Sequence, residues 1–444
     1  MPAKYASWRG PIGRPSDQAK YIPTAFLRKC GPKLTINENG AVSWQIEPVI
    51  DQLLMVLRGA IFIRDPKHEE LNEYDAWGLI RKGLINTVKN QGGKQPIDPE
   101  QLLKEVNIQA AQFFQTPETE YVVVGSLSVA TFPVRSIRIN GCKIWPLASR
   151  KKYPYPDVPG LRLGTNMRKR LDASKYQLVA VKTRGRTHND AVNRAMRALD
   201  VLRGIWTLSL VGGRNLLAFG PQTTPVGVIH HGPVHTLHKI GGVPVEGIFW
   251  REPTSNEDWN LFSLDEGWAK LEKVRKWAFR RLGTSEMGND IQELIARYAV
   301  ALDQTDFEIA FLHLWAVLEK LTQTIGGSYD ETIKRACWWF DDKDLVKEIL
   351  ECGRLRRNRY VHTAQTAANT DELVHVIKSI LDPLLVSLIR DDLRVPSLED
   401  VGRILSLPTD VATLRKERNR YNRAIAILER RTVRDASPDA KAKG

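Results

Sequence analysis

The sequence predicts an α+β protein in which a mixed α/β N-terminal domain precedes an all-helical bundle. Two observations support this fold class. Before residue 285, segments with the alternation and β-branched content of strands mix with segments of helical spacing. From Gly288 to about Arg394 almost every segment has helical periodicity and the connections are short, which is typical of an antiparallel bundle. We therefore expect domains at 1–285 and 288–395, followed by a basic, partly disordered tail at 396–444.

The first half of the N-terminal domain contains one clear helix and one clear strand. Residues 1–45 are rich in Pro, Gly and Lys and suggest an irregular lead-in, whereas the pattern of 42–65 does not decide between strand and helix. Apolar residues recur at helical spacing in 100–114. Residues 121–129 (YVVVGSLSV) are β-rich, and further short strands are expected up to Pro146.

The second half of this domain adds a strand followed by a helix. Residues 147–175 combine prolines, glycines and two basic clusters, which favours an exposed loop over a segment that grips phosphates. Residues 176–183 predict a strand, and Thr187 with Asp190 forms an N-cap pair for the next helix. The rest of the domain is expected to hold a glycine-rich, strand-like region and a basic amphipathic helix, at 205–250 and 264–282.

The bundle is predicted from apolar stripes at helical spacing. Gly326 and Gly327 end the second and broadest stripe, and Asn369 with Glu372 begins the last helix. After Asp410 the tail is highly charged, with a middle that has a helical pattern and a disordered end. The stripes comprise Ile291, Leu294, Ile295, Tyr298 and Leu302; Phe307, Phe311, Leu314, Trp315, Leu318 and Leu321; residues 331–340; residues 345–362; and Leu373, Val376, Ile377, Ile380, Leu384 and Leu388.

The charge balance favours a polyanionic partner. The 444-residue chain has 65 Lys and Arg against 51 Asp and Glu, a net charge of +14. Such a surplus favours nucleic acid first and an acidic membrane surface second, although basic tails on an ordinary soluble protein explain it equally well. The N-terminus has no apolar signal core, and no apolar run approaches the roughly 20 residues that span a bilayer. We therefore expect a cytoplasmic protein with no membrane partner.

The cysteines do not suggest a metal site. Cys30, Cys142, Cys337 and Cys352 lie far apart and form no CxxC pair, so buried thiols in a reducing compartment are expected. The sequence has no P-loop, no GxGxxG after a strand, no HExxH and no GxSxG, which leaves nucleotide hydrolysis, hydride transfer, zinc proteolysis and hydrolase chemistry without a basis.

Chemistry is most strongly indicated by the segment RLRRNRYVH, residues 354–362, late in the predicted bundle. Arg357 is directly followed by Asn358, and an aromatic and an aliphatic residue stand just before His362. The bare spacing of Arg and His has little value in so basic a chain. Its context gives it weight, because an earlier helix contains LWAVLEKL, residues 314–321.

Together these two motifs resemble the ApeA-like branch of the HEPN superfamily, in which a helix of the form LW-x-x-LE-x-L precedes an R-N-x-x-x-H segment. The resemblance covers residues 289–394, and a glycine that is typical after the histidine is replaced here by Thr363 and Ala364. It implies RNA cleavage without metal or cofactor, with Arg357, Asn358 and His362 as the catalytic residues. It also implies an acid at Glu319 that supports a site arginine, and roles in antiviral defence or as a toxin.

The residue types fit this chemistry. RNA contains its own nucleophile, the 2′-hydroxyl. Histidine is the residue type whose ordinary pKa is near neutral, so His362 is the candidate to move the proton of that hydroxyl. Arg357 offers a planar fork to a phosphate as negative charge builds. Arg354, Arg356 and Arg359 are candidate contacts to flanking phosphates, or ordinary surface charges.

Helical geometry predicts a shared site. If the segment is helical, positions 358 and 362 share a face, while positions 357 and 362 lie about 140° apart. HEPN proteins dimerise across such segments, so we expect RNA as a partner, a homodimer through the helical domain, and a trigger or regulator bound by the N-terminal domain. Two alternatives remain: Arg357 and His362 as ordinary helix-surface residues, and a HEPN fold that binds RNA or acts as a scaffold without turnover.

A second cluster, HHGPVHTLH, contains His230, His231, His235 and His238. Its spacing matches no standard metal site. The preferred interpretation is a polar loop of strand and turn, with a metal site or a ligand contact as alternatives.

Overall fold

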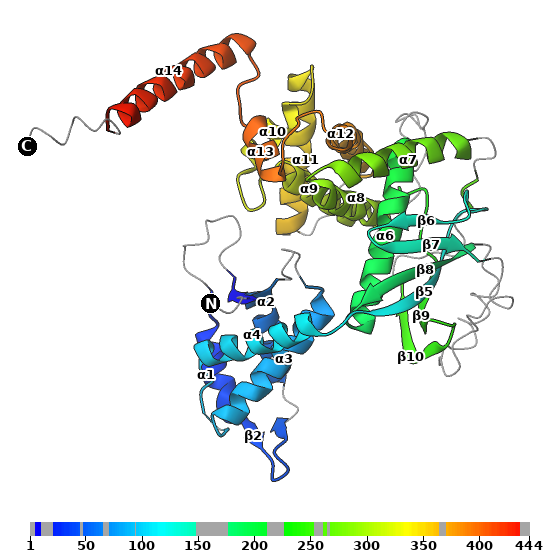
Figure 1. The fold of residues 1–444 in the computed structure, drawn as a ribbon, viewed down its shortest axis with the longest axis vertical. Coiled ribbons are helices and arrows are strands. Elements are labelled where there is room, and N and C mark those ends of the chain that lie inside the picture. The colour runs from blue at the N-terminus through cyan, green and yellow to red at the C-terminus, as the bar shows by residue number, and fades with distance from the viewer. Residues whose placement is uncertain are drawn as a thin grey trace, which may run out of the picture.

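The structure, a computed structural model, describes residues 5–9, 21–44, 48–64, 71–93, 95–147, 176–210, 226–252, 261–263, 267–363 and 370–435. It confirms the predicted fold class, because mixed α/β structure around an antiparallel sheet is followed by an all-helical C-terminal region. Figure 1 shows this order along the chain. The basic segment at 147–175 lies, apart from Leu147, outside the described residues, as does the end of the tail.

The first part of the chain forms a small helical subdomain with a core of its own (Figure 1). The strands pair antiparallel, β1 with β4 and β2 with β3. The helix predicted at 100–114 is confirmed as α4, with Asp98 as its N-cap and Pro99 at its first position. The elements are β1 (Ala6–Trp8), α1 (Thr24–Cys30), the 3₁₀ helix η1 (Gly31–Lys33), β2 (Leu34–Ile36), β3 (Val42–Trp44), α2 (Pro48–Ala60), β4 (Ile61–Ile63), α3 (Glu73–Asn90) and α4 (Pro99–Gln115).

The described strands of the central sheet have the order β10-β9-β5-β8-β7-β6, and all neighbours are antiparallel. The strands predicted at 121–129 and 176–183 are confirmed as β5 and β8, which pair along their whole length. Apolar residues that alternate along these strands are buried beneath helices. The bounds are β5 (Thr119–Leu127), β6 (Ile137–Ile139), β7 (Cys142–Pro146), β8 (Gln177–Gly185), β9 (Val234–Lys239) and β10 (Pro244–Arg251).

Helix α6 (His188–Ser209) joins the sheet to the helical region, because it contacts β8 on one side and α8 (Gly288–Leu302) on the other. The predicted N-cap pair is present: the Asp190 N–H donates to Thr187 Oγ1 at 3.0 Å, and the Arg186 N–H donates to Asp190 Oδ2 at 2.9 Å. A Cβ at Gly204 would lie 2.6 Å from Ile295 Cγ2, so glycine permits the close approach of α6 and α8. The helix extends to Ser209, so the expectation of strand-like structure from residue 205 was wrong for 205–209.

The C-terminal helices pack into the same core as the sheet. The boundary between the two main hydrophobic cores therefore lies between α4 and β5. The change to purely helical periodicity, from which the domain boundary was predicted, lies near Gly288. The apolar stripe predicted for the second helix is buried in α9, with only Phe307 partly exposed. The helices are α7 (Trp268–Thr284), α8, α9 (Phe307–Leu321), α10 (Tyr329–Cys337), α11 (Lys343–Thr363), α12 (Thr370–Arg390), α13 (Leu398–Leu405) and α14 (Val411–Asp435).

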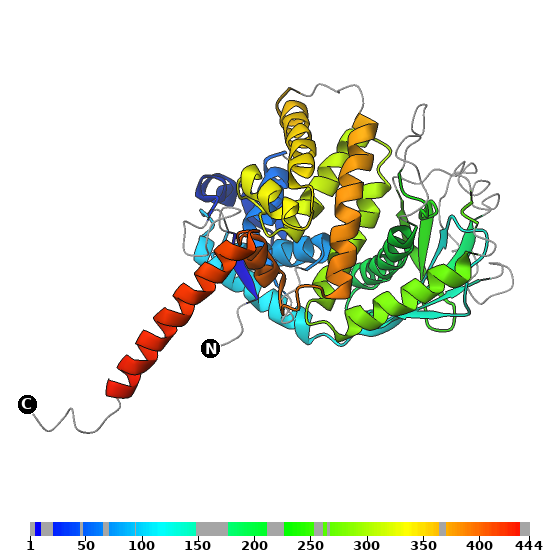
Figure 2. The ribbon, with the colours of Figure 1, turned by 90° about the horizontal axis from the view of Figure 1, so that it is seen from above.

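The helical middle expected for the tail is present as α14, whereas α13 was not predicted. Leu398, Val401 and Leu405 of α13 are buried in the main core, and α14 extends away from the body (Figure 2). Of the helices described, none has both the length and the apolar character that crossing a bilayer requires.

Candidate active site

Helix α11 contains the segment that the sequence singled out. It extends to Thr363, so residues 354–362 are helical throughout. At 100° per residue, positions 358 and 362 therefore share a face, and position 357 lies about 140° from position 362. Asn358 is partly buried. The side chains of Arg359 and His362 lie outside the part of the chain that the structure describes.

Arg357 is held by two side chains from two other helices. Its Nη1 donates a hydrogen bond to the Tyr329 hydroxyl at the start of α10. Its guanidinium carbon lies 4.9 Å from the centre of the Tyr329 ring, within the range of a cation–π contact. Its Nη2 lies 3.9 Å from Glu319 Oε1 on α9. The Arg357 side chain is 25% exposed, so its position is fixed while solvent reaches part of the guanidinium.

Glu319 is itself fixed from the core. Its Oε1 accepts a hydrogen bond from the indole Nε1 of Trp315 at 2.9 Å, and Trp315 is fully buried. A Cβ at Gly353 would lie 3.1 Å from Phe311 and 3.3 Å from Trp315, so the absence of a side chain lets α11 approach α9. The tryptophan and the glutamate of the LWAVLEKL motif thus act together beside Arg357.

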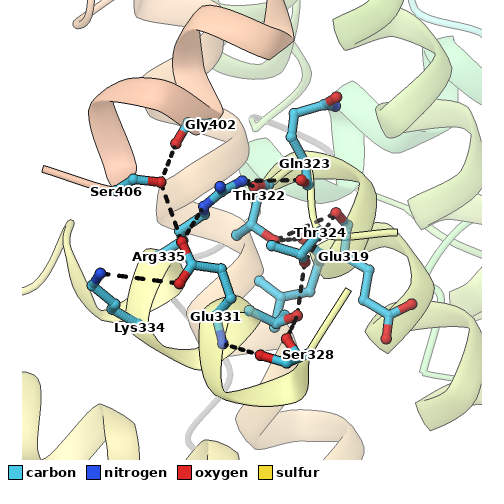
Figure 3. A network of polar contacts seen from close by, with 12 residues as sticks. Glu319, Thr322, Gln323, Thr324, Ser328, Glu331, Lys334, Arg335, Gly402 and Ser406 are labelled. Carbon is cyan, nitrogen blue, oxygen red and sulfur yellow. Dashed lines mark hydrogen bonds and ion pairs between the residues drawn. The ribbon is translucent and has the colours of Figure 1, made fainter. Parts of the chain in front are cut away.

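A polar network fixes the turn between α9 and α10, and Figure 3 shows it from close by. Thr324 donates its N–H to the Glu319 carbonyl at 2.9 Å, and its hydroxyl lies 2.7 Å from that of Thr332. Arg335 donates to the backbone carbonyls of Thr322 and Gln323 at 2.7 and 2.9 Å. Because this turn lies between Glu319 and Tyr329, the network sets the separation of the two residues that hold Arg357.

The neighbouring arginines differ in their surroundings. Arg354, one helical turn before Arg357, donates to Asp330 Oδ1 at 2.9 Å and pairs with Glu351 Oε2 at 2.6 Å. Arg356 is partly buried. Arg354 therefore reaches the surface beside Arg357, with both of its acidic partners also on the rim of a pocket.

This pocket lies between α10, α11 and residues 405–409, and its volume is about 520 Å³, which is in the range of small-molecule sites. Its lining combines an aromatic ring, Trp338, with Lys334, Lys343 and Lys347. Cys337 also lines it, and burial raises the pKa of this thiol to about 11, so the thiol is protonated and weakly nucleophilic at neutral pH.

A second charged cluster is buried where α6, the end of α8 and the segment before β9 meet. Arg203 is 2% exposed and pairs with Asp200 at 2.7 Å and with Asp303. His230 Nδ1 lies 3.0 Å from Asp303 Oδ1, and His231 Nε2 lies 2.7 Å from Asp200 Oδ1. Burial opposes the ionisation of Asp200, but Arg203 and His231 outweigh it and lower the pKa of Asp200.

The interpretation of the histidine cluster as a polar loop of strand and turn was therefore wrong about exposure, although the expected strand is present as β9. His230, His231, His235 and His238 are all buried, and the last two lie on β9. Among the described residues, no group of three or more His, Cys, Asp or Glu side chains is placed to hold a metal ion. His230 and His231, through their hydrogen bonds to Asp303 and Asp200, make the cluster part of the packing between sheet and helices.

Sequence reasoning missed Tyr329 as well as the buried partners Asp200, Arg203 and Asp303. Tyr329 directly follows Ser328, the N-cap of α10, and a helix start beside the site was the signal that could have found it. Asp200 and Arg203 are three residues apart on α6, but Asp303 lies 100 residues after Arg203, and no local pattern connects it to them.

No protein-family model matches the sequence, and no protein of curated function and no solved structure shows significant similarity to the chain. The resemblance to HEPN proteins therefore rests on the two motifs and stays a hypothesis.

Proposed function

We propose that this chain is a metal-independent endoribonuclease of the HEPN type, with Arg357, Asn358 and His362 in its catalytic centre. The observation that carries the proposal is the Arg357 guanidinium, fixed by Glu319 and Tyr329 and still partly open to solvent. An arginine has five N–H donors. The Tyr329 hydroxyl accepts from one of them, and Glu319 lies 3.9 Å from a second nitrogen. The others are available to the oxygens of a phosphate.

The proposed reaction follows from the substrate. His362 takes the proton of an RNA 2′-hydroxyl, and that oxygen attacks the adjacent phosphorus. Arg357 donates hydrogen bonds to the non-bridging oxygens as the phosphorane forms. The bond to the 5′ oxygen breaks and that oxygen takes a proton from an imidazolium, so the products are a 2′,3′-cyclic phosphate and a 5′-hydroxyl. Asn358, on the same helix face as position 362, is proposed to orient the imidazole.

RNA on either side of the scissile phosphate would meet basic and aromatic side chains. Arg354, Arg356 and Arg359 are proposed to contact flanking phosphates. The adjacent pocket offers Trp338 to stack on a base and Lys347 to contact a phosphate. A homodimer through the helical domain would place two α11 segments across one cleft, and the N-terminal domain would bind a trigger. Antiviral defence or a toxin role is what the resemblance suggests for the biology.

The direct test uses the purified full-length chain with an RNA and a DNA of the same sequence, in the presence of EDTA. We expect cleavage of RNA alone, loss of cleavage in His362→Ala, and nearly unchanged RNA affinity in that variant. Cleavage of DNA, or loss of RNA cleavage on adding EDTA, would contradict the proposal. Because such enzymes are often silent without their trigger, toxicity on expression that Arg357→Ala relieves is a second readout.

A non-catalytic RNA-binding or scaffold protein is the second candidate. It is favoured by the exposed surface of α14, whose sequence contains eight basic and three acidic residues. It predicts RNA binding that falls steeply with salt and no cleavage under any condition.

A further inference from the structure

Helix α14 is a long helix that leaves the body of the protein (Figures 1 and 2). It has 25 residues and begins directly after Asp410, whose carboxylate accepts the Thr413 N–H at 2.7 Å. Every residue from 418 to 430 is exposed. A free-standing helix of this length, about 37 Å, gains most of its stability from packing against another surface.

Most of the large exposed apolar residues of α14 fall on one stripe, and Ile427 lies off it. Val411, Leu414, Tyr421, Ile425 and Leu428 occupy the a and d positions of a seven-residue repeat, with Arg418 at the one intervening a position. Four of the five are exposed and Leu414 is partly buried. A repeat of 3.5 residues keeps such a stripe facing one partner helix from Val411 to Leu428. The next a and d positions, Thr432 and Asp435, are polar. The pattern is therefore that of a coiled-coil seam.

We propose that α14 pairs antiparallel with α14 of a second copy of this chain. The inference is independent of the ribonuclease proposal. The orientation follows from Arg418: in a parallel pair the two Arg418 side chains would share one layer of the seam. In the antiparallel pair Arg418 lies beside Leu428 of the second copy, which its aliphatic stem can cover, and Tyr421 lies against Ile425.

The residues beside the seam are complementary in the same register. At the flanking e positions, Arg415 lies opposite Glu429 of the second copy, and the symmetry repeats this pair at the other end. Asn422 meets its own counterpart at the two-fold axis, where no charge is repeated. The parallel alternative would place Glu429 beside Ala424, which offers no partner. Charge complementarity thus favours α14 of a second copy of this chain, in antiparallel orientation, as the partner of the stripe.

The chain supplies a matched pair of variants, because Ile425 and Ile427 are both 52% exposed but only Ile425 lies on the seam. We expect the full-length wild type to sediment as a dimer at micromolar concentration. Ile425→Lys should weaken dimerisation by about 100-fold or more, because it places a charge in the seam. Ile427→Lys should leave it unchanged. Equal effects of the two substitutions would overturn the proposal, as would a monomeric wild type or a dimer dissociation constant that Ile425→Lys leaves unchanged. In the last case a contact elsewhere in the chain would hold the dimer without α14.

A charge exchange tests the orientation. Arg415→Glu should weaken the dimer, and adding Glu429→Arg should restore it, because the two substitutions recreate the pair only in the antiparallel register. Failure of the double variant to restore dimerisation would overturn the antiparallel arrangement. If Ile425→Lys instead reduces binding of a single-stranded RNA and leaves the mass unchanged, the stripe is an RNA-contacting surface and the coiled coil is rejected.

Discussion

Two arginines in this molecule are each held by an acid on another element. They differ in how much of the guanidinium remains open to solvent. Arg203 is 2% exposed, pairs with Asp200 and Asp303, and donates to the Ile229 carbonyl at 3.2 Å. Arg357 is 25% exposed and is held on one side by Glu319 and Tyr329. The first cluster joins sheet to helices, whereas the second holds a cation at the surface.

The difference teaches how to separate a structural charge from a functional one. A buried ion pair contributes little net stability over apolar packing, but removing one partner leaves an uncompensated charge. A partly exposed arginine costs little to remove, and its fixed geometry has value only for something that arrives from solvent. Each of the four predictions below tests one side of this contrast, in order of decreasing effect.

The largest effect is expected for Arg203→Met, which removes the cation between two buried carboxylates. We expect the free energy of unfolding to fall by about 3–5 kcal/mol, as measured by urea denaturation. Arg194→Met, on the same helix but 39% exposed and paired with Asp190 and Glu118, is the matched control and should cost at most about 1 kcal/mol. Equal losses of unfolding free energy in the two variants would show that the buried and the exposed arginine contribute alike to stability.

Arg357→Ala should reduce activity strongly and change the stability of the fold little, the opposite of what is expected for Arg203→Met. We expect RNA cleavage to fall by about 10²–10³-fold, because a donor to the phosphorane is lost, with a small change in the unfolding midpoint. Arg357→Lys should not restore the rate, because an ammonium lacks the planar fork. Arg403→Ala, a surface arginine on α13, should leave rate and stability as they are. A large loss of stability in Arg357→Ala would show that Arg357, like Arg203, has a structural role.

The supports of Arg357 should have smaller effects. Glu319→Gln keeps an acceptor for Trp315 but removes the charge beside Arg357, and Tyr329→Phe keeps the ring but removes the hydroxyl. Tyr329→Phe removes one hydrogen bond to a charged group, and Glu319→Gln removes an ion pair with a separation of 3.9 Å. For each variant we expect kcat to fall about 10-fold with KM nearly constant. A change in KM alone, measured by initial rates, would mean that these residues act in binding and not in positioning.

The smallest effect concerns pH. The pKa of Asp200 is lowered from 3.8 in the folded state, so its ionisation stabilises the fold above about pH 4, and this contribution disappears as the pH falls through the lowered value. The difference in unfolding free energy between wild type and Asp200→Asn should therefore shrink below pH 4. A difference that stays constant from pH 7 to pH 3, measured by urea denaturation, would show that Asp200 is not the group that titrates.

Sequence patterns predicted the features of the fold that depend on residues close together in the chain. The N-cap pair of α6 and the apolar stripe of α9 follow from residues a few positions apart, and both were predicted from the sequence. The short elements α1, β2 and β3 were missed in a segment read as irregular, because three to seven residues carry too little periodicity. The shared core of sheet and helices could not be predicted, because it depends on contacts such as that of Gly204 with Ile295.

The residues of the candidate site also divide into those that the motifs predicted and those that depend on packing between distant segments. The motifs indicated Glu319 and Arg357, and the structure places them 3.9 Å apart. Tyr329 and the turn network beside it come from the packing of α10 and have no signature in the motifs. Asp200 and Asp303, the partners of His231 and His230, lie 31 and 73 residues away in the sequence, so no local pattern showed that these histidines are buried.

The most direct test of the central claim uses an RNA with one deoxyribonucleotide at the mapped cleavage position. Attack by the 2′-hydroxyl requires that this single substitution stops cleavage there while other positions are still cut, and that the natural RNA yields a 2′,3′-cyclic phosphate. Cleavage at the deoxyribonucleotide, or a 5′-phosphate on the product of the natural RNA, would contradict the assignment of Arg357 and His362 to a HEPN-type ribonuclease.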